Sequence, residues 1–168
     1  MDADTFVALC MAQVTPLYRY FVHQIGNVHD AEDLMAMTVN KALASITRFD
    51  PASGTFTAWL FGIARHTLRD FQRRQRPMSD IAAMSAPLID SAPTLDTQIV
   101  RIEEATLLLA RVRQLPTGQR EALMLYYFGA LKAAEIARVL GRSEGAVRLL
   151  IHRALTTLRG QYRQEDRP

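Results

Sequence analysis

The segment Lys132–Leu155, KAAEIARVLGRSEGAVRLLIHRAL, carries the clearest structural signal in the chain. Its first half predicts a short helix with small and apolar residues on one face, small enough for a second helix to cross closely. Gly141 follows, and glycine ends such a helix readily because it adopts the left-handed backbone conformation without steric strain. The predicted apolar face consists of Ala133, Ala134, Ile136, Ala137 and Leu140.

The second half of this segment predicts another helix, for which Ser143 is a suitable N-cap. Two helices joined by a tight glycine turn, the second with a largely basic front, predict a helix-turn-helix that lies in the major groove of duplex DNA. The alternative is an ordinary helical hairpin with a solvated basic face. The buried stripe comprises Val147, Leu150, Ile151, Ala154 and Leu158, and the opposite face Glu144, Arg148, Leu149, His152, Arg153, Thr156 and Arg159.

Composition describes a globular protein that can bury one or two small cores, since 49% of the 168 residues are hydrophobic and 22% are charged. No apolar run approaches the about 20 residues of a membrane span. The N-terminus, with Asp2 and Asp4, does not resemble a secretion signal. We therefore expect a cytoplasmic protein with no membrane insertion. The single cysteine, Cys10, is expected to be a small buried hydrophobe.

The net charge of +3 conceals a pattern along the chain. Residues 1–60 hold three basic and six acidic residues (−3), and residues 61–76 hold five basic and one acidic (+4). Residues 77–100 hold three acidic and no basic residues (−3), and residues 101–168 hold twelve basic and seven acidic (+5). Two basic zones separated by an acidic segment suggest two contacts with a polyanion.

The chain is predicted to be all-α, with two small helical domains. The segment from Pro77 to Thr97 is rich in Pro, Ser, Ala and Asp without a sustained apolar period, which is typical of a linker. The predicted division is therefore residues 1–76, a linker at 77–97, and residues 98–168. Apolar residues recur at helical spacing through Phe6–Ile25, Ala31–Ile46, Phe56–Phe71, Ile99–Val112 and Glu121–Phe128.

Three helix starts are signalled. Asp30 precedes AEDL, which would place Asp30, Glu32 and Asp33 in a first turn, where the helix dipole favours anions. Thr55 is a candidate cap for the helix that carries Trp59, and Pro116 with Thr117 opens a third helix.

An arginine stripe is predicted on the outward side of the helix that starts at Phe56, where it could follow a phosphate backbone. Upstream lies RFDPASGTFTAW, a loop with aromatic residues on which unpaired bases can stack. The alternative is that these aromatic residues are core, and for Phe56 we favour that interpretation. The stripe is Arg65, Arg69, Arg73 and Arg76, and the aromatic residues are Phe49, Phe56 and Trp59.

The order DAEDL, RFDPASGTFTAWLFGIARHTLRDFQRR, a linker, then LPTGQREALMLYYFGALKAAEIARVLGRSEGAVRLLIHRAL resembles the extracytoplasmic-function (ECF) sigma factors over about residues 15–160. The resemblance implies that the N-terminal domain binds core RNA polymerase and melts the minus-ten promoter element. It implies that the C-terminal domain reads the minus-thirty-five element, and that an anti-sigma factor is a partner. Melting is then driven by capture of an unpaired base, which offsets an unstacking cost of about a few kcal/mol.

The resemblance also assigns residues to three surfaces. The helix after Asp30 would dock on the large polymerase subunit, and the loop Asp50–Thr55 would hold the non-template strand. The core-polymerase set is Asp30, Glu32, Asp33, Leu34, Asn40 and Lys41. The minus-ten set is Trp59, Arg65, His66, Arg69, Arg73 and Arg74. The minus-thirty-five set is Ser143, Glu144, Arg148, Leu149, His152 and Arg153.

The sequence departs from the family pattern in three places. Ala36 and Met37 stand where the family usually has Gln and an acidic residue, which removes two polar contacts expected at polymerase. His66 stands where Asn is common, so the preferred base does not carry over. Leu149 and Leu150 replace Ser and Arg. Leu149 lies on the groove-facing side, where it would meet either a thymine methyl group or a partner protein.

Two other classes of function fit the sequence less well. A stand-alone regulator would bind an operator as a dimer through the same helix-turn-helix, but the aromatic loop and the arginine stripe suit melted DNA better. An enzyme is disfavoured, and no cofactor or metal is predicted. Cys10 has no obvious base, and the four histidines do not fall at metal-ligand spacing. Those histidines are His23, His29, His66 and His152.

Overall fold

A computed structural model of the chain describes residues 2–75 and 106–165, with side chains as far as Tyr162. All regular structure in these two ranges is helical, which confirms the predicted fold class. The predicted linker at 77–97 and Arg76 lie outside the described residues. The elements are α1 (Ala3–Ile25), α2 (Val28–Ser45), a 3-10 turn η1 (Ile46–Arg48), α3 (Phe56–Gln75), α5 (Thr117–Tyr127), α6 (Ala133–Leu140) and α7 (Glu144–Glu165), and residues 106–114 are also helical.

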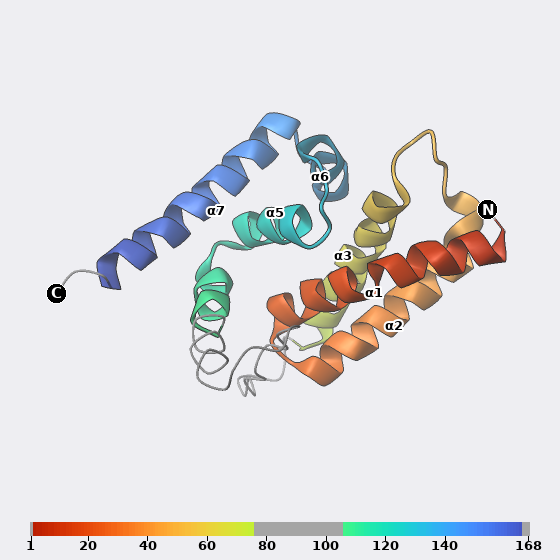
Figure 1. Cartoon of the computed structure of the whole chain (residues 1–168), viewed down its shortest axis with the longest axis horizontal. Coiled ribbons are helices and arrows are strands. Elements are labelled where there is room, and N and C mark those ends of the chain that lie inside the picture. Colours follow the sequence, from red (N-terminus) through yellow and green to blue (C-terminus); the bar gives the residue numbers. More distant parts are fainter. Residues whose placement is uncertain (1, 76–105, 166–168) are drawn as a thin grey trace, which may run out of the picture.

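The N-terminal helical domain consists of α1, α2 and α3. Helices α1 and α2 run in opposite directions side by side, and α3 packs across both (Figure 1). The core between them is aromatic, with the rings of Tyr20 and Phe61 meeting edge to face at 5.4 Å between centroids. Cys10 is buried as expected, and burial raises the pKa of its thiol. The largest fully buried side chains here are Leu17, Tyr20, Phe21, Leu34, Leu60, Phe61 and Leu68.

Helix α1 ends at Gly26, and α2 begins almost at once. Gly26 has φ +74° and donates its N–H to Val22, closing the last turn in a left-handed conformation that favours glycine. Asn27 then caps α2 by accepting the N–H of Asp30 at 3.1 Å. The helix therefore starts three residues earlier than predicted. Asp30 does lie in the first turn, but Glu32 and Asp33 lie beyond it, because Asn27 supplies the cap and Asp30 does not.

The C-terminal helical domain contains the predicted helix-turn-helix. Gly141 ends α6 with φ +64°, and the hydroxyl of Ser143 caps α7 by accepting the N–H of Ala146 at 3.2 Å. Val147 and Ala154 of α7 are fully buried against α5 and α6, as the apolar stripe predicts. Ala134, expected on the apolar face of α6, is exposed. The rest of that face packs inward.

The two domains are in direct contact. Helix α6 lies against α3, and α5 approaches the end of α1 (Figure 1). Buried residues of both domains consequently belong to one continuous hydrophobic cluster. None of the described helices combines the length and the apolar character that a membrane span requires.

Candidate nucleic-acid interface

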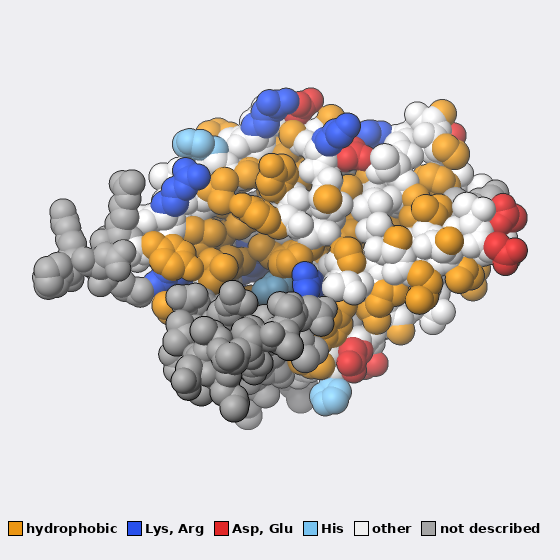
Figure 2. Space-filling model, in the orientation of Figure 1, with side chains coloured by type: hydrophobic (Ala, Val, Ile, Leu, Met, Phe, Trp, Pro, Cys, Tyr) orange, Lys and Arg blue, Asp and Glu red, His pale blue; other side chains and the backbone are white. Residues whose placement is uncertain are grey.

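Helix α7 presents an exposed, largely basic face to solvent. Figure 2 shows basic side chains and a histidine along the outer edge of the molecule over α7. Arg148 is oriented by the Glu144 carboxylate, which accepts a hydrogen bond from its Nε at 3.1 Å. Leu149 is 46% exposed, so an apolar side chain interrupts the basic face. The exposed members of the predicted minus-thirty-five set are Ser143, Glu144, Arg148, Leu149, His152 and Arg153.

The aromatic loop of the N-terminal domain is half core and half surface. Phe56 is buried between Phe6 and Phe49, which confirms its interpretation as a core residue. Trp59 packs on Phe49 and Phe56, with ring centroids 5.3 Å and 5.6 Å away, yet remains partly exposed. Its ring is thus held by packing while an edge or face remains accessible for stacking.

The loop before α3 is ordered by local hydrogen bonds. The Asp50 carboxylate accepts the Ala52 N–H at 3.0 Å and the Ser53 hydroxyl at 2.7 Å. These two hydrogen bonds, that from Ser53 foremost, lower the pKa of Asp50 below its usual value. Thr55 caps α3 as predicted, because its hydroxyl accepts the Ala58 N–H at 3.2 Å.

The arginine stripe is not uniformly outward. Arg69, Arg73 and Arg74 are exposed on α3, as is His66. Arg65, by contrast, is only 7% exposed, and its guanidinium reaches the carboxylate of Glu121 on α5. The prediction of a solvent-facing Arg65 is therefore wrong for this structure, because the C-terminal domain covers that turn of α3.

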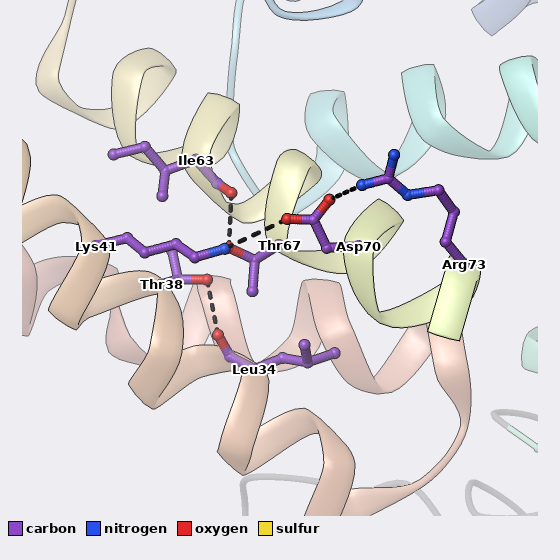
Figure 3. Close-up of polar contacts among 7 residues, drawn as sticks. All are labelled: Leu34, Thr38, Lys41, Ile63, Thr67, Asp70 and Arg73. Carbon is purple, nitrogen blue, oxygen red and sulfur yellow. Dashed lines mark hydrogen bonds and ion pairs between the residues drawn. The ribbon is translucent and has the colours of Figure 1, made fainter. Parts of the chain in front are cut away.

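A polar network joins α2 to α3 next to this stripe (Figure 3). Lys41 donates to the Thr67 hydroxyl at 3.2 Å, and its Nζ lies 3.6 Å from a carboxylate oxygen of Asp70. Asp70 also pairs with Arg73. Partial burial raises the pKa of Asp70, but the contacts with Arg73 and Lys41 outweigh it, and the net shift is downward. Lys41 and Arg73, predicted for different surfaces, thus share one carboxylate.

The predicted polymerase-binding residues lie along α2 with different exposures. Glu32, Asp33, Asn40 and Lys41 are exposed, and Asp30 is partly accessible. Leu34 is 1% exposed and belongs to the core of the N-terminal domain. In this structure it therefore does not lie on the exposed side of α2, where the prediction places it. Its carbonyl oxygen accepts the hydroxyl of buried Thr38 at 2.7 Å (Figure 3).

A pocket of about 430 Å³ lies between the aromatic loop and α6. The N-terminal domain contributes the residues expected to hold an unpaired base, including Phe49, Trp59 and His66. Helix α6 contributes Glu135 and Arg138, which the sequence did not predict near this loop. Among the described residues no cluster of His, Cys, Asp or Glu suits a metal ion.

The structure adds functional candidates that helical periodicity does not reveal. Glu121, Glu135 and Arg138 each contact the other domain across more than 50 residues of sequence. Each also fits an ordinary position in its own helix. Glu135, for instance, caps the start of α6 by accepting the Lys132 N–H at 2.9 Å. Only the packing of the two domains shows their second role.

Each of the two domains matches a known protein family. Residues 11–77 match Sigma-70 region 2, and residues 105–158 match Sigma-70 region 4. These two matches follow the division seen in the fold, with the helix-turn-helix in the second.

The chain is also similar in sequence to proteins named as ECF RNA polymerase sigma factors. The chain is 34% identical over 160 residues to the ECF RNA polymerase sigma factor BldN of Streptomyces coelicolor, covering 94% of this chain and 60% of BldN. It is 32% identical over 149 residues to EcfG of Rhodopseudomonas palustris, covering 88% of this chain and 80% of that protein. It is 26% identical to SigW of Bacillus subtilis, covering 96% and 91%.

Solved structures share the fold. CnrH, in complex with the cytosolic domain of CnrY, superposes with a TM-score of 0.71 at 23% identity, over 98% of this chain and 92% of CnrH. RpoE of Bartonella quintana, in complex with the anti-sigma factor NepR, gives 0.73 at 21% identity, over 96% and 98%. The matches to Sigma-70 regions 2 and 4 define a transcription initiation factor. The chain belongs to the ECF RNA polymerase sigma factors, which bind core polymerase and promoter DNA.

Proposed function

We propose that residues 1–76 bind core RNA polymerase and capture the melted minus-ten element, while residues 98–168 read the minus-thirty-five element. The observation that carries this proposal is the pairing of two unlike surfaces on one chain. One is a helix-turn-helix with an exposed basic helix, and the other is a half-exposed tryptophan beside exposed arginines. Duplex DNA suits the first surface and unpaired bases suit the second.

The exposed face of α7 is the proposed reader of duplex DNA. Arg148 and Arg153 provide forked donors for phosphate oxygens or guanine edges, and His152 lies on the same side. Leu149 offers only an apolar contact, and the thymine methyl group is the base feature that an apolar side chain reads in the major groove.

The proposed minus-ten surface combines stacking and charge. Trp59 supplies a ring whose back is packed on Phe49, so it is held in place before a base arrives. Arg69, Arg73 and Arg74 would contact the phosphates of the non-template strand, with His66 at the rim of the pocket. Binding energy alone drives such capture. We therefore infer that the protein is not an enzyme. We also infer that it acts in the cytoplasm, together with polymerase.

The proposed polymerase surface is the exposed side of α2, with Glu32, Asp33 and Asn40 as its centre. Met37, which is 40% exposed, stands on the same helix and replaces a polar residue of the family pattern by an apolar one. We also infer an anti-sigma partner. CnrH and the Bartonella RpoE, which share this fold, were each solved with a bound partner.

Run-off transcription tests the proposed function. Sigma-free core polymerase is incubated with host genomic DNA, with and without this protein, and the transcript starts are mapped. We expect discrete new starts that share two upstream elements. The absence of new starts, together with operator binding by the protein alone, would instead indicate a stand-alone regulator.

A further inference from the structure

Two arginines of the predicted minus-ten set, Arg65 and Arg69, contact the C-terminal domain. The Arg65 guanidinium contacts Glu121 on α5, with Nε to Oε1 at 3.4 Å and Nη2 to Oε2 at 3.4 Å. Its Nη1 also donates to the Val139 carbonyl oxygen of α6 at 3.2 Å. The Nε of Arg69 lies 3.6 Å from the same Glu121 carboxylate. One carboxylate thus faces two adjacent arginines of α3.

The loop that precedes α3 is engaged as well. Thr55 donates its hydroxyl to the Glu135 carboxylate at 2.5 Å, and Arg138 donates to the Ser53 carbonyl oxygen. Arg138 also approaches Gly54 so closely that a Cβ there would lie 2.9 Å from its Nη1. Helix α6 therefore forms one wall of the pocket that Trp59 and His66 line.

A second area of contact lies at the far end of α1. The His23 ring stacks on Phe128 at 4.7 Å between centroids, with an interplanar angle of 10°. Arg120 donates to the Gln24 side-chain oxygen at 3.2 Å. The contacts at α3 and those at the end of α1 together fix the orientation of the C-terminal domain.

These contacts exclude DNA from the part of this surface around Arg65. A carboxylate and a phosphate both present paired oxygens to a guanidinium fork, so Glu121 occupies the position that a backbone phosphate would take. A buried arginine needs one such partner, since an unpaired buried charge is strongly disfavoured. Arg65 can be paired with Glu121 or with a phosphate, but the two states are mutually exclusive.

We propose that the minus-ten surface of the N-terminal domain is a docking surface for the C-terminal domain of the same chain, so that the free protein keeps itself closed. Undocking of Glu121 and α6 uncovers Arg65 and opens the pocket beside Trp59. The masking part of this proposal rests on the proposed function of α3, whereas the docking itself does not.

The test uses the full-length protein without polymerase. The variants are Glu121→Gln, which keeps the shape but removes the charge, and Arg138→Ala, which removes the contact with Ser53. Asp4→Asn is the matched control, because it also removes one negative charge but lies on the exposed first turn of α1. The probe is a fluorescein-labelled single-stranded DNA of 12 nucleotides with randomised sequence, and small-angle scattering gives the radius of gyration.

We expect Glu121→Gln to have a larger radius of gyration and to bind the probe about tenfold more tightly, because the apparent affinity scales with the fraction of open protein. Arg138→Ala should bind about threefold more tightly. That increase is opposite in sign to the effect of simply losing a positive charge. Asp4→Asn should match the wild type in size and binding.

Unchanged size and binding in both variants would overturn docking. A larger radius in a variant that binds the probe, but no more tightly than the wild type, would overturn masking. If no variant binds the probe although Glu121→Gln has expanded, the failure lies in the proposed DNA surface and docking stands. Helical content by circular dichroism identifies any variant that has unfolded, in which case the other variant decides.

Discussion

Leu149 is the residue at which this chain departs most clearly from a basic reading surface. It is nearly half exposed, between Arg148 and His152 on the free side of α7. Exposure of an apolar side chain to water is unfavourable, whereas packing of the leucine against a methyl group removes apolar surface of both groups from water. Its position therefore favours a site that contains a thymine.

Leu149→Ala tests this contact. In a minus-thirty-five site mapped by run-off transcription, replacing each thymine in turn by deoxyuridine removes only a methyl group, and one of these positions should be the one that Leu149 contacts. We expect this change to weaken binding by the wild type about fourfold, corresponding to about 0.8 kcal/mol for one buried carbon group. The Leu149→Ala variant should be insensitive to the change. Equal sensitivity in both proteins, measured by fluorescence anisotropy, would place the methyl group elsewhere.

Trp59 is expected to act on melted DNA only. Trp59→Ala should reduce open-complex formation about tenfold or more, because stacking a base on an aromatic ring is worth about 1–3 kcal/mol. Closed-complex formation should change little. Permanganate reactivity of unpaired thymines measures the first, and footprinting of duplex promoter the second. Trp59→Phe, which keeps a ring, should retain most of the opening; a similar loss at both steps would contradict a melting role.

At the scale of the elements, two helices end in glycines with the same backbone conformation but different surroundings. Gly26 and Gly141 have φ of +74° and +64°. A Cβ on Gly141 would meet nothing within 4 Å, whereas a Cβ on Gly26 would lie 1.8 Å from the Arg113 guanidinium of the other domain. Glycine at position 26 is thus favoured by its backbone conformation, and any side chain there would also have to displace the Arg113 guanidinium.

Gly26→Ala and Gly141→Ala separate these two requirements. Each should lower the free energy of unfolding by about 1–2 kcal/mol through left-handed strain, as measured by urea denaturation. Only Gly26→Ala should also increase the radius of gyration, because it displaces Arg113 at the contact between domains. An unchanged radius in Gly26→Ala would show that Arg113 rearranges without loosening the contact.

The elements were predictable to different degrees for physical reasons. Gly141 and Ser143 act on their immediate neighbours, so the helix-turn-helix follows from local sequence. The sequence pattern predicts a start of α2 that is three residues too late, because Asn27, an equally good cap, precedes Asp30. The burial of Arg65 could not be predicted, since it depends on Glu121, 56 residues away in another domain. Periodicity shows which side of a helix faces its own core, and not what covers the other side.

At the scale of the whole molecule, one of the contacts between the two domains involves a histidine, His23. His23 lies against Phe128, and its burial, together with the charges of Arg113 and Arg19, lowers its pKa from 6.5 to about 4. The closed form therefore holds His23 neutral. Its contribution to closure is complete above about pH 6.5 and declines as the pH falls toward 4, since the open form then binds more protons.

Acidification should accordingly open the protein. Between pH 7.5 and pH 5 we expect the radius of gyration to increase, with the closed fraction disfavoured by up to about tenfold per pH unit below 6.5. Burial raises the pKa of Glu135, but hydrogen bonds from Thr55 and the Lys132 N–H leave that pKa below its usual value. His23→Phe keeps a ring against Phe128 and should show no such change; the same expansion in this variant would exclude His23 as the cause.

The pairing of Arg65 with Glu121 has a consequence for dosage. An inhibitor on a separate polypeptide dissociates when both proteins are dilute, because the fraction of bound protein depends on the inhibitor concentration. Two groups on one chain remain at the same effective concentration however few molecules a cell contains. The first copy synthesised is therefore as well restrained as the thousandth, and leakage at low expression is set by the strength of the contact alone.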